Sequence, residues 1–304
     1  MNEENLNEAK SKFEEGLKLF EKKDYELAEK NFLESLNLAP QRLSVISNLI
    51  KIYIVSEQIQ KLDEILTQYK NLNNKKEILF GRAYSLFFNE NFDESIKICN
   101  QLIKNNDIKY SIQDLLASNF KKKSNYLEAL KIYKNKLLEN SNDYKIYYNI
   151  GCLLFELGKI NQAYYYFRKS MNLNPNNKDI SWRFSLCALT LKDFKNGFLF
   201  YEDRWNRENA PKKKFDKIES PMNISEIKDK KILIWDEQGL GDTINFSRFV
   251  IDILKFTKKV TFAVDKKLKD ILSGLDKEIY VVDYESLNES NYDFQIALGS
   301  LPKL

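Results

Sequence analysis

The sequence contains no histidine and only three cysteines among its 304 residues. Without histidine, the chain cannot use imidazole as a general base, a nucleophile or a metal ligand. Any catalytic group would therefore have to be Asp, Glu, Lys, Tyr, Ser or Cys. Cys99, Cys152 and Cys187 lie far apart in helical patterns. This disfavours both a disulfide framework and a zinc cluster, and it favours a reducing compartment.

Long apolar runs and a strong charge of one sign are also missing. No apolar stretch approaches the roughly 20 residues that span a bilayer, and the polar, acidic start does not resemble a signal peptide. We therefore expect a cytoplasmic protein without a membrane span. The net charge of +4 is too small to predict a nucleic-acid partner. The short basic runs Lys121–Lys123 and Lys212–Lys214 indicate solvated surface, with phosphate binding as the alternative.

What the sequence does have is an internal repeat over its first two hundred residues. Small and large side chains alternate at positions that recur about every 34 residues. One mostly small position reads Gly16, Ile50, Ala83, Ala117, Gly151 and Ser185. A large position further on reads Phe32, Leu66, Cys99, Tyr133, Phe167 and Tyr201. The alternation predicts stacked pairs of antiparallel helices, which meet at the small residues, while the large ones fill the gap to the next pair.

The segment Tyr144–Asn177 shows the pattern best, with Gly158 at the turn between its helices and Pro175 ending the second. These residues resemble the tetratricopeptide repeat family, over about residues 9 to 206 and six repeats. The resemblance implies an α-solenoid that binds a protein or an extended peptide. In some relatives an asparagine on the first helix of each repeat holds the peptide backbone. Asn48 and Asn149 occupy that position here, and a plain surface or intrahelical role is the alternative.

The last repeat ends in Phe194-Lys-Asn-Gly-Phe-Leu-Phe-Tyr-Glu-Asp-Arg-Trp205. This string resembles the closing repeat of bacterial repeat-containing glycosyltransferases, F-x-x-G-x-x-x-Y-E-x-R-W. A compatible interpretation is a capping helix, with Trp205 covering the apolar end of the solenoid.

Beyond residue 206 the helical period stops. Residues 207–229 are charged, contain two prolines and have no period, which predicts a linker. Apolar strands then alternate with helices, and this order predicts a parallel sheet with crossover helices. The predicted strands are 231–235, 260–264, 278–282 and 294–298, and the predicted helices are 243–256 and 266–272.

A glycine-bracketed turn, Asp236-Glu-Gln-Gly-Leu-Gly-Asp242, follows the first predicted strand. Ligands of parallel sheets bind at the carboxyl ends of strands. The turn is neither a phosphate-binding P-loop nor a dinucleotide fingerprint. The longer string over residues 233–248 resembles the glycosyltransferase-like domain that follows tetratricopeptide repeats in many bacterial proteins. That domain is similar to heptosyltransferases and, more distantly, to O-linked N-acetylglucosamine transferase.

This second resemblance implies a partial α/β Rossmann-like domain at residues 230–304, the acceptor-side, amino-terminal half of a GT-B fold. It also implies Asp242 as a catalytic carboxylate, because sugar transfer needs a base for the acceptor hydroxyl. Helix capping is the alternative role of Asp242, and Glu237 is the second candidate base. No metal is expected. The candidate substrate-binding residues are Gln238, Gly239, Gly241, Thr243 and Arg248.

The resemblance covers about residues 190 to 304, and the donor-binding half has no counterpart in this sequence. We therefore expect the amino-terminal part of a repeat-containing glycosyltransferase, whose repeats recognise a protein partner or acceptor. No cofactor is expected, and a nucleotide-sugar donor would need the second half of the fold. The alternative is a non-catalytic scaffold for protein–protein interaction.

Overall fold

The computed structural model describes residues 3–104, 109–207, 210, 212–287 and 291–304. The chain forms two compact units, Met1–Glu139 and Asn140–Leu304, which we name the first and the second unit. The predicted domains, 1–206, 207–229 and 230–304, divide the chain by type of structure instead, and these boundaries stay a prediction.

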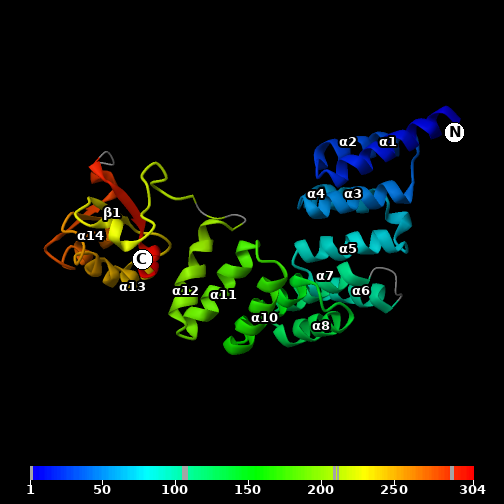
Figure 1. Ribbon diagram of the computed structural model, residues 1–304. Coiled ribbons are helices and arrows are strands. Elements are labelled where there is room, and N and C mark those ends of the chain that lie inside the picture. Colours follow the sequence, from blue (N-terminus) through cyan, green and yellow to red (C-terminus); the bar gives the residue numbers. More distant parts are fainter. Residues whose placement is uncertain (1–2, 105–108, 208–209, 211, 288–290) are drawn as a thin grey trace. The chain divides into compact units, whose positions relative to one another are not determined.

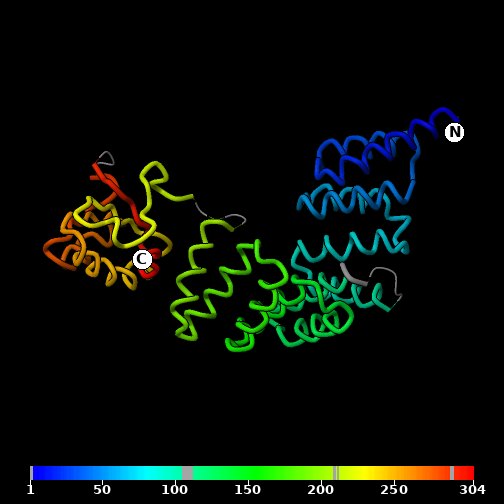
Figure 2. The backbone as a smooth tube through the Cα atoms, in the orientation of Figure 1, coloured from blue at the N-terminus to red at the C-terminus, as the bar shows by residue number. Residues whose placement is uncertain are grey.

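The first unit is built of α-helices that pair as antiparallel hairpins (Figure 1). Consecutive helices form each hairpin, and the smooth trace in Figure 2 shows the short turns that join them. The helices are α1 (Glu3–Glu21), α2 (Tyr25–Leu38), α3 (Leu43–Val55), α4 (Ile59–Gln68), α5 (Lys76–Phe88), α6 (Phe92–Lys104), α7 (Lys109–Lys122) and α8 (Tyr126–Glu139).

The second unit begins with two more hairpins of the same kind. Their helices are α9 (Tyr144–Glu156), α10 (Ile160–Leu173), α11 (Lys178–Thr190) and α12 (Phe194–Tyr201), and the 3₁₀ helix η2 (Glu202–Trp205) follows directly. The two units together thus contain six hairpins among the residues that the structure describes.

Both recurring positions of the sequence pattern are buried in every hairpin. The closest contacts join the two helices of one hairpin. A Cβ added to Gly16 would lie 2.6 Å from the Phe32 ring, and one added to Gly151 would lie 2.8 Å from the Phe167 ring. In these two hairpins the large side chain occupies the space opposite the small one of its own hairpin, whereas the sequence prediction placed it against the next pair. Leu66 does lie against the next pair, 3.1 Å from a Cβ added to Gly81 of α5.

Each hairpin turn passes through one residue in the left-handed conformation. The φ angles lie between 54° and 69° at Lys23, Glu57, Glu90, Ser124, Gly158 and Lys192. The following residue donates its backbone N–H back into the first helix, as Lys159 does to the Leu154 carbonyl at 2.8 Å. This bond satisfies a carbonyl that the helix end would otherwise leave free.

A four-stranded parallel sheet follows, with strand order β3-β2-β1-β4. Its elements are β1 (Ile232–Trp235), α13 (Leu240–Ile253), β2 (Val260–Val264), α14 (Lys266–Leu272), β3 (Ile279–Asp283) and β4 (Phe294–Ala297), with short 3₁₀ helices η3 (Ile224–Ile227), η4 (Tyr284–Ser286) and η6 (Leu298–Lys303). The predicted parallel sheet is confirmed. Helix α13 begins at Leu240, three residues before the predicted start. Gly239, whose backbone is extended, is its N-cap residue.

Both faces of the sheet are covered, as is usual for parallel strands. Every residue of β1 and β2 is buried. Helices α13 and α14 pack on the face of Ile232 and Ile234. Phe215 packs on the opposite face, with its ring 5.9 Å from that of Trp235. The segment predicted as a linker therefore contributes a buried side chain to the core of the α/β segment.

Candidate functional site

The turn Asp236–Asp242 leaves the sheet at the carboxyl end of the central strand β1. Strands β2 and β3 lie on one side of β1, and β4 lies on the other. The direction of strand order therefore reverses at β1. Open parallel sheets bind ligands in the crevice at such a reversal, which makes this turn the candidate site.

Arg204, in η2 after the last hairpin, holds the turn in place. Its side chain is buried and donates two hydrogen bonds to Glu237, Nε to Oε2 at 2.8 Å and Nη2 to Oε1 at 2.7 Å. It also donates to Glu202 at 2.7 Å and to the Ser300 hydroxyl at 2.8 Å. The backbone N–H of Gly299 donates to Glu237 Oε1 at 2.7 Å. One ion pair thus joins the repeat end, the turn and the segment after β4.

The surroundings keep Arg204 charged. Burial alone would lower the pKa of Arg204, but hydrogen bonding to Glu237 and the negative charges of Glu237 and Glu202 outweigh burial and raise it. The guanidinium carbon also lies 4.6 Å from the Tyr201 ring centre and 4.7 Å from that of Trp205. Because Arg204 and Gly299 engage both carboxylate oxygens of Glu237, a catalytic role for Glu237 would require this pair to open.

Asp236 ties the turn to neighbouring parts of the sheet. Its side chain accepts hydrogen bonds from Lys214 Nζ at 2.9 Å, from the Asp265 backbone N–H at 2.7 Å and from the Tyr284 hydroxyl. Burial, together with the bond to Asp236 and its negative charge, raises the pKa of Tyr284. The hydroxyl therefore stays a donor at neutral pH, and Asp236 has a positioning role that the sequence did not predict.

The remaining predicted residues of the turn are mostly exposed. Gln238 donates its side-chain N–H to the Tyr201 hydroxyl at 2.6 Å. Asp242 is exposed in the first turn of α13, and its Oδ2 accepts the Gly239 backbone N–H at 3.3 Å. This is a capping bond, made from the third helical position. Gly241 is exposed and has open space around it.

The structure brings three of the predicted side chains, Glu237, Gln238 and Asp242, around one hollow. Its volume is about 10 Å³, which is room for no more than one water molecule. No sugar-sized space is enclosed there. The role of Asp242 as a base therefore stays a prediction.

Two other predicted substrate residues do not line this hollow. Thr243 is buried, and its hydroxyl donates to the Gly239 carbonyl at 3.3 Å. Arg248 is exposed and lies 4.9 Å from the Phe249 ring centre. It lines a different, mostly apolar cavity of about 700 Å³.

The predicted peptide-groove residues lie on first helices, Asn48 on α3 of the first unit and Asn149 on α9 of the second. Both are half-buried. Asn48 donates its side-chain N–H to the Ser44 carbonyl of its own helix at 2.8 Å. This bond matches the intrahelical alternative.

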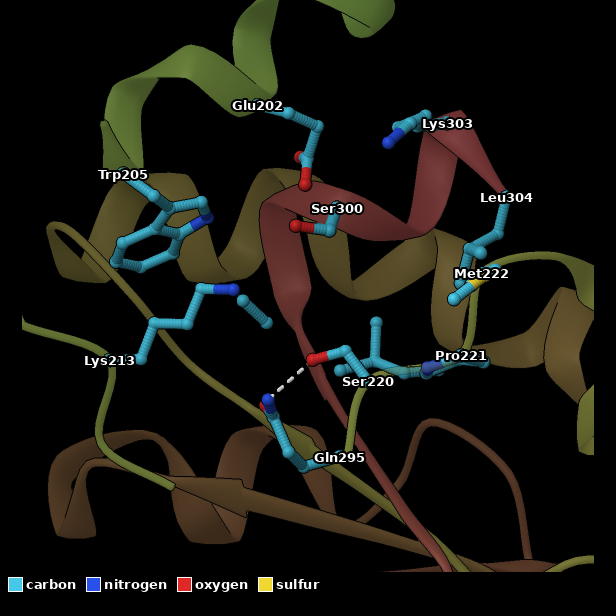
Figure 3. A pocket seen from close by; sticks show the side chains of 12 residues that line it. Glu202, Trp205, Lys213, Ser220, Pro221, Met222, Gln295, Ser300, Lys303 and Leu304 are labelled. Atoms are coloured by element: carbon cyan, nitrogen blue, oxygen red, sulfur yellow. Dashed lines mark hydrogen bonds between the residues drawn. The ribbon is translucent and has the colours of Figure 1, made fainter. Parts of the chain in front are cut away.

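A cavity of about 250 Å³ lies at the carboxyl end of β4 (Figure 3). Trp205 and Lys213 border it on one side, and Met222 borders it on the opposite side. Gln295 donates to the Ser220 hydroxyl at 2.6 Å, as the dashed line shows. The Nε1 of Trp205 is buried, without a hydrogen-bond partner among the described residues. The strand reversal is therefore flanked by more than one hollow.

Sequence reasoning missed the partners that position the turn. Arg204 and Trp205 were noted in the closing string of the repeats, as part of the resemblance and of a cap, but without a partner in the turn. A buried arginine needs a carboxylate partner, and the acidic pair Asp236-Glu237 was the available indication. Within the described residues, no group of three or more Cys, Asp or Glu side chains is placed to hold a metal ion.

Comparison with known proteins supports the repeat assignment. The family model of the tetratricopeptide repeat matches residues 144–177. Anaphase-promoting complex subunit 3 of Schizosaccharomyces pombe is 20% identical over 222 residues, covering 72% of this chain and 31% of that protein. The chain thus spans less than a third of the length of this curated relative.

Solved structures show the same fold at low sequence identity. PilW, a widely conserved type IV pilus biogenesis factor, matches 70% of this chain and 97% of its own, with a TM-score of 0.59 and 16% identity. PilF of Pseudomonas aeruginosa matches 67% of this chain and 93% of its own, with a TM-score of 0.54 and 12% identity. The chain is thus a tetratricopeptide repeat array followed by a small four-stranded parallel α/β segment.

Among the described residues, no helix combines sufficient length with sufficient apolar character to cross a bilayer.

Proposed function

We propose that the chain is a scaffold for protein–protein interaction, with the tetratricopeptide repeats as its binding element. The observation that carries this proposal is the run of six hairpins with one buried small–large pattern, because such arrays present an extended surface to partners. The relative in Schizosaccharomyces pombe is named as a subunit of a complex, which supports the same function.

Two asparagines provide a matched test of this scaffold. Asn48 on α3 and Asn31 on α2 both donate to a carbonyl of their own helix, at 2.8 and 3.0 Å. Only Asn48 lies on a first helix, at the predicted peptide position. We expect Asn48→Ala to weaken capture of the partners that the full chain recovers, and Asn31→Ala to leave capture unchanged. Equal capture by wild type and Asn48→Ala would remove Asn48 from the binding surface.

A second candidate function is one half of a sugar-transfer site at the turn. Its support is the resemblance of residues 233–248 and the place of the turn at the strand reversal. In this proposal Asp242 takes the proton of an acceptor hydroxyl, and the donor half is supplied by other sequence.

The test of this second function is transfer from a nucleotide sugar by protein that contains both halves. Asp242→Asn should lower turnover by about two to four orders of magnitude. Asp252→Asn changes an exposed aspartate on the same helix that pairs with Lys255 at 2.6 Å, and it should not change turnover. Unchanged turnover in Asp242→Asn would exclude this base, and no transfer by wild type would leave the scaffold as the function.

A further inference from the structure

A cavity of about 330 Å³ lies beside the turn, lined by α11, η2 and the carboxyl end of β1. This volume falls within the range of small-molecule sites. The chain has three tryptophans, and all of them, Trp182, Trp205 and Trp235, line this cavity. Tyr201 adds a fourth aromatic ring. Trp235 and Tyr201 are almost fully buried, so Trp182 and Trp205, which are half-buried, offer the aromatic surface that a flat ring can contact.

Cations lie against these rings. The Arg207 guanidinium is 3.9 Å from the ring centre of Trp182, and Lys214 Nζ is 6.0 Å from that of Trp235. Lys214 is already paired with Asp236. Arg207 and Lys212 also line the cavity, and they have no ion pair among the residues described. The cavity therefore carries a positive charge that an anionic ligand would neutralise.

The polar groups of the cavity further restrict the ligand. Arg204 and Gly299 occupy the Glu237 carboxylate, and Gln238 already donates to Tyr201. A ring rich in hydroxyl groups would bury polar atoms here without partners, which is costly. A flat, stackable ring with an anionic tail would use both the aromatic walls and the unpaired cations.

We propose that this cavity binds a nucleoside phosphate, with the base against Trp182 and Trp205 and the phosphate on Arg207 and Lys212. This binding does not depend on the scaffold function or on the sugar-transfer function. It assigns a ligand to Lys212, one residue of the basic run Lys212–Lys214 for which the sequence left phosphate binding open.

Tryptophan fluorescence tests the proposal directly, because every tryptophan of the chain lines the cavity. Titration of the full chain with ADP should give a saturable change. Adenosine lacks the anion and inorganic phosphate lacks the ring, so each should bind at least about tenfold more weakly. No saturable change up to about 1 mM ADP, or phosphate binding as tightly as ADP, would overturn the proposal.

Three variants separate the cavity from general charge. Arg207→Gln and Lys212→Gln should each weaken ADP binding by about tenfold. Lys267→Gln removes an exposed lysine on α14, outside the cavity, and should bind as wild type does. Far-UV circular dichroism checks the fold of Arg207→Gln, while Lys212 is exposed and its variant should fold. Unchanged binding in Lys212→Gln together with a folded, unchanged Arg207→Gln would overturn the proposal.

Discussion

At the scale of single residues, the buried pair of Arg204 and Glu237 has a large expected effect on stability. Arg204→Ala would leave the Glu237 carboxylate buried without its cation, and we expect a loss of about 3–5 kcal/mol in the free energy of unfolding. The double variant Arg204→Met with Glu237→Leu should lose less, because no unpaired charge remains. Urea unfolding followed by tryptophan fluorescence measures this, since all three tryptophans belong to the second unit.

Arg248→Ala is the control for the Arg204 variants. Arg248 is exposed on α13, and its removal should change the free energy of unfolding by no more than about 0.5 kcal/mol. A double variant less stable than Arg204→Ala would show that the ion pair is not what makes the single substitution costly.

The buried thiols predict a pH dependence. Burial raises the pKa of Cys99 to about 11 and that of Cys187 to about 12, from an ordinary value of 9.0. The unfolded chain therefore loses these protons at lower pH than the folded chain. The contribution of these two thiols to the free energy of unfolding should be constant below about pH 9. It should fall as the pH rises from there towards 11 and 12. Stability that rises over this interval would contradict the assigned burial.

The same thiols predict labelling rates. Thiolate is the reactive form, so Cys99 and Cys187 should react slowly with a thiol reagent at pH 8. Cys152, which is half-buried, should account for the fast phase. Cys152→Ser is then expected to remove that phase, as seen in the time course of labelling.

The sequence located the candidate turn but not the residues that hold it. Gly239, Gly241 and the acidic residues stand out because they follow a strand. Arg204 and Glu237 are 33 residues apart, and no period or motif spacing relates them. A contact of that kind depends on how the last hairpin packs on the sheet, which residue patterns alone do not determine.

At the scale of elements, the left-handed turn residues allow two substitutions in the same unit with opposite expected effects on stability. Lys192 is exposed with φ at 64°, and Gly158 has φ at 69° with open space around it. A side chain in this conformation costs roughly 1–2 kcal/mol. Lys192→Gly should therefore stabilise the second unit by up to about 1 kcal/mol, and Gly158→Ala should destabilise it by a similar amount.

Urea unfolding followed by tryptophan fluorescence measures the unfolding midpoint of both turn variants. If the two shifted the unfolding midpoint in the same direction, the backbone conformation would not be the cause. The sequence indicated this kind of turn only at Gly158. The other five residues are lysine, glutamate or serine, and they adopt the left-handed conformation because backbone hydrogen bonds across the turn hold them there.

The strands were predictable because apolar runs between polar turns have few other interpretations. All four lie within one residue of the predicted bounds. Phe215 was missed, since a single aromatic residue among charged ones has no period. It is buried because the face of β1 that carries Trp235 would otherwise be open to water.

At the scale of the whole molecule, the last two hairpins and the sheet belong to one compact unit. A fragment of residues 140–304 should therefore unfold cooperatively, with the urea midpoint that tryptophan fluorescence gives for the full chain. A fragment of residues 207–304 lacks Arg204 and Trp205, which leaves Glu237 unpaired and part of Trp235 uncovered. We expect no cooperative transition from the shorter fragment, and a transition at the full-chain midpoint would contradict this division.

The sequence predicted where the helical repeats end and the α/β segment begins. It did not predict the boundary between the two compact units. The repeating pattern of small and large residues ends near residue 206. The compact second unit instead begins at Asn140 and includes the last two hairpins, and Trp205 of η2 packs on the sheet. Burial of this kind depends on three-dimensional contacts, which periodicity does not report.

The ion pair at the turn also sets an order of events during synthesis. Arg204 leaves the ribosome before Glu237, and Ser300, another of its partners, lies 96 residues later. At about 5–20 residues per second, that interval lasts roughly 5–20 s. Throughout it, the newly made last hairpin keeps a hydrated guanidinium and an uncovered tryptophan at its end. A chaperone that recognises exposed aromatic surface would have its best opportunity to bind during those seconds.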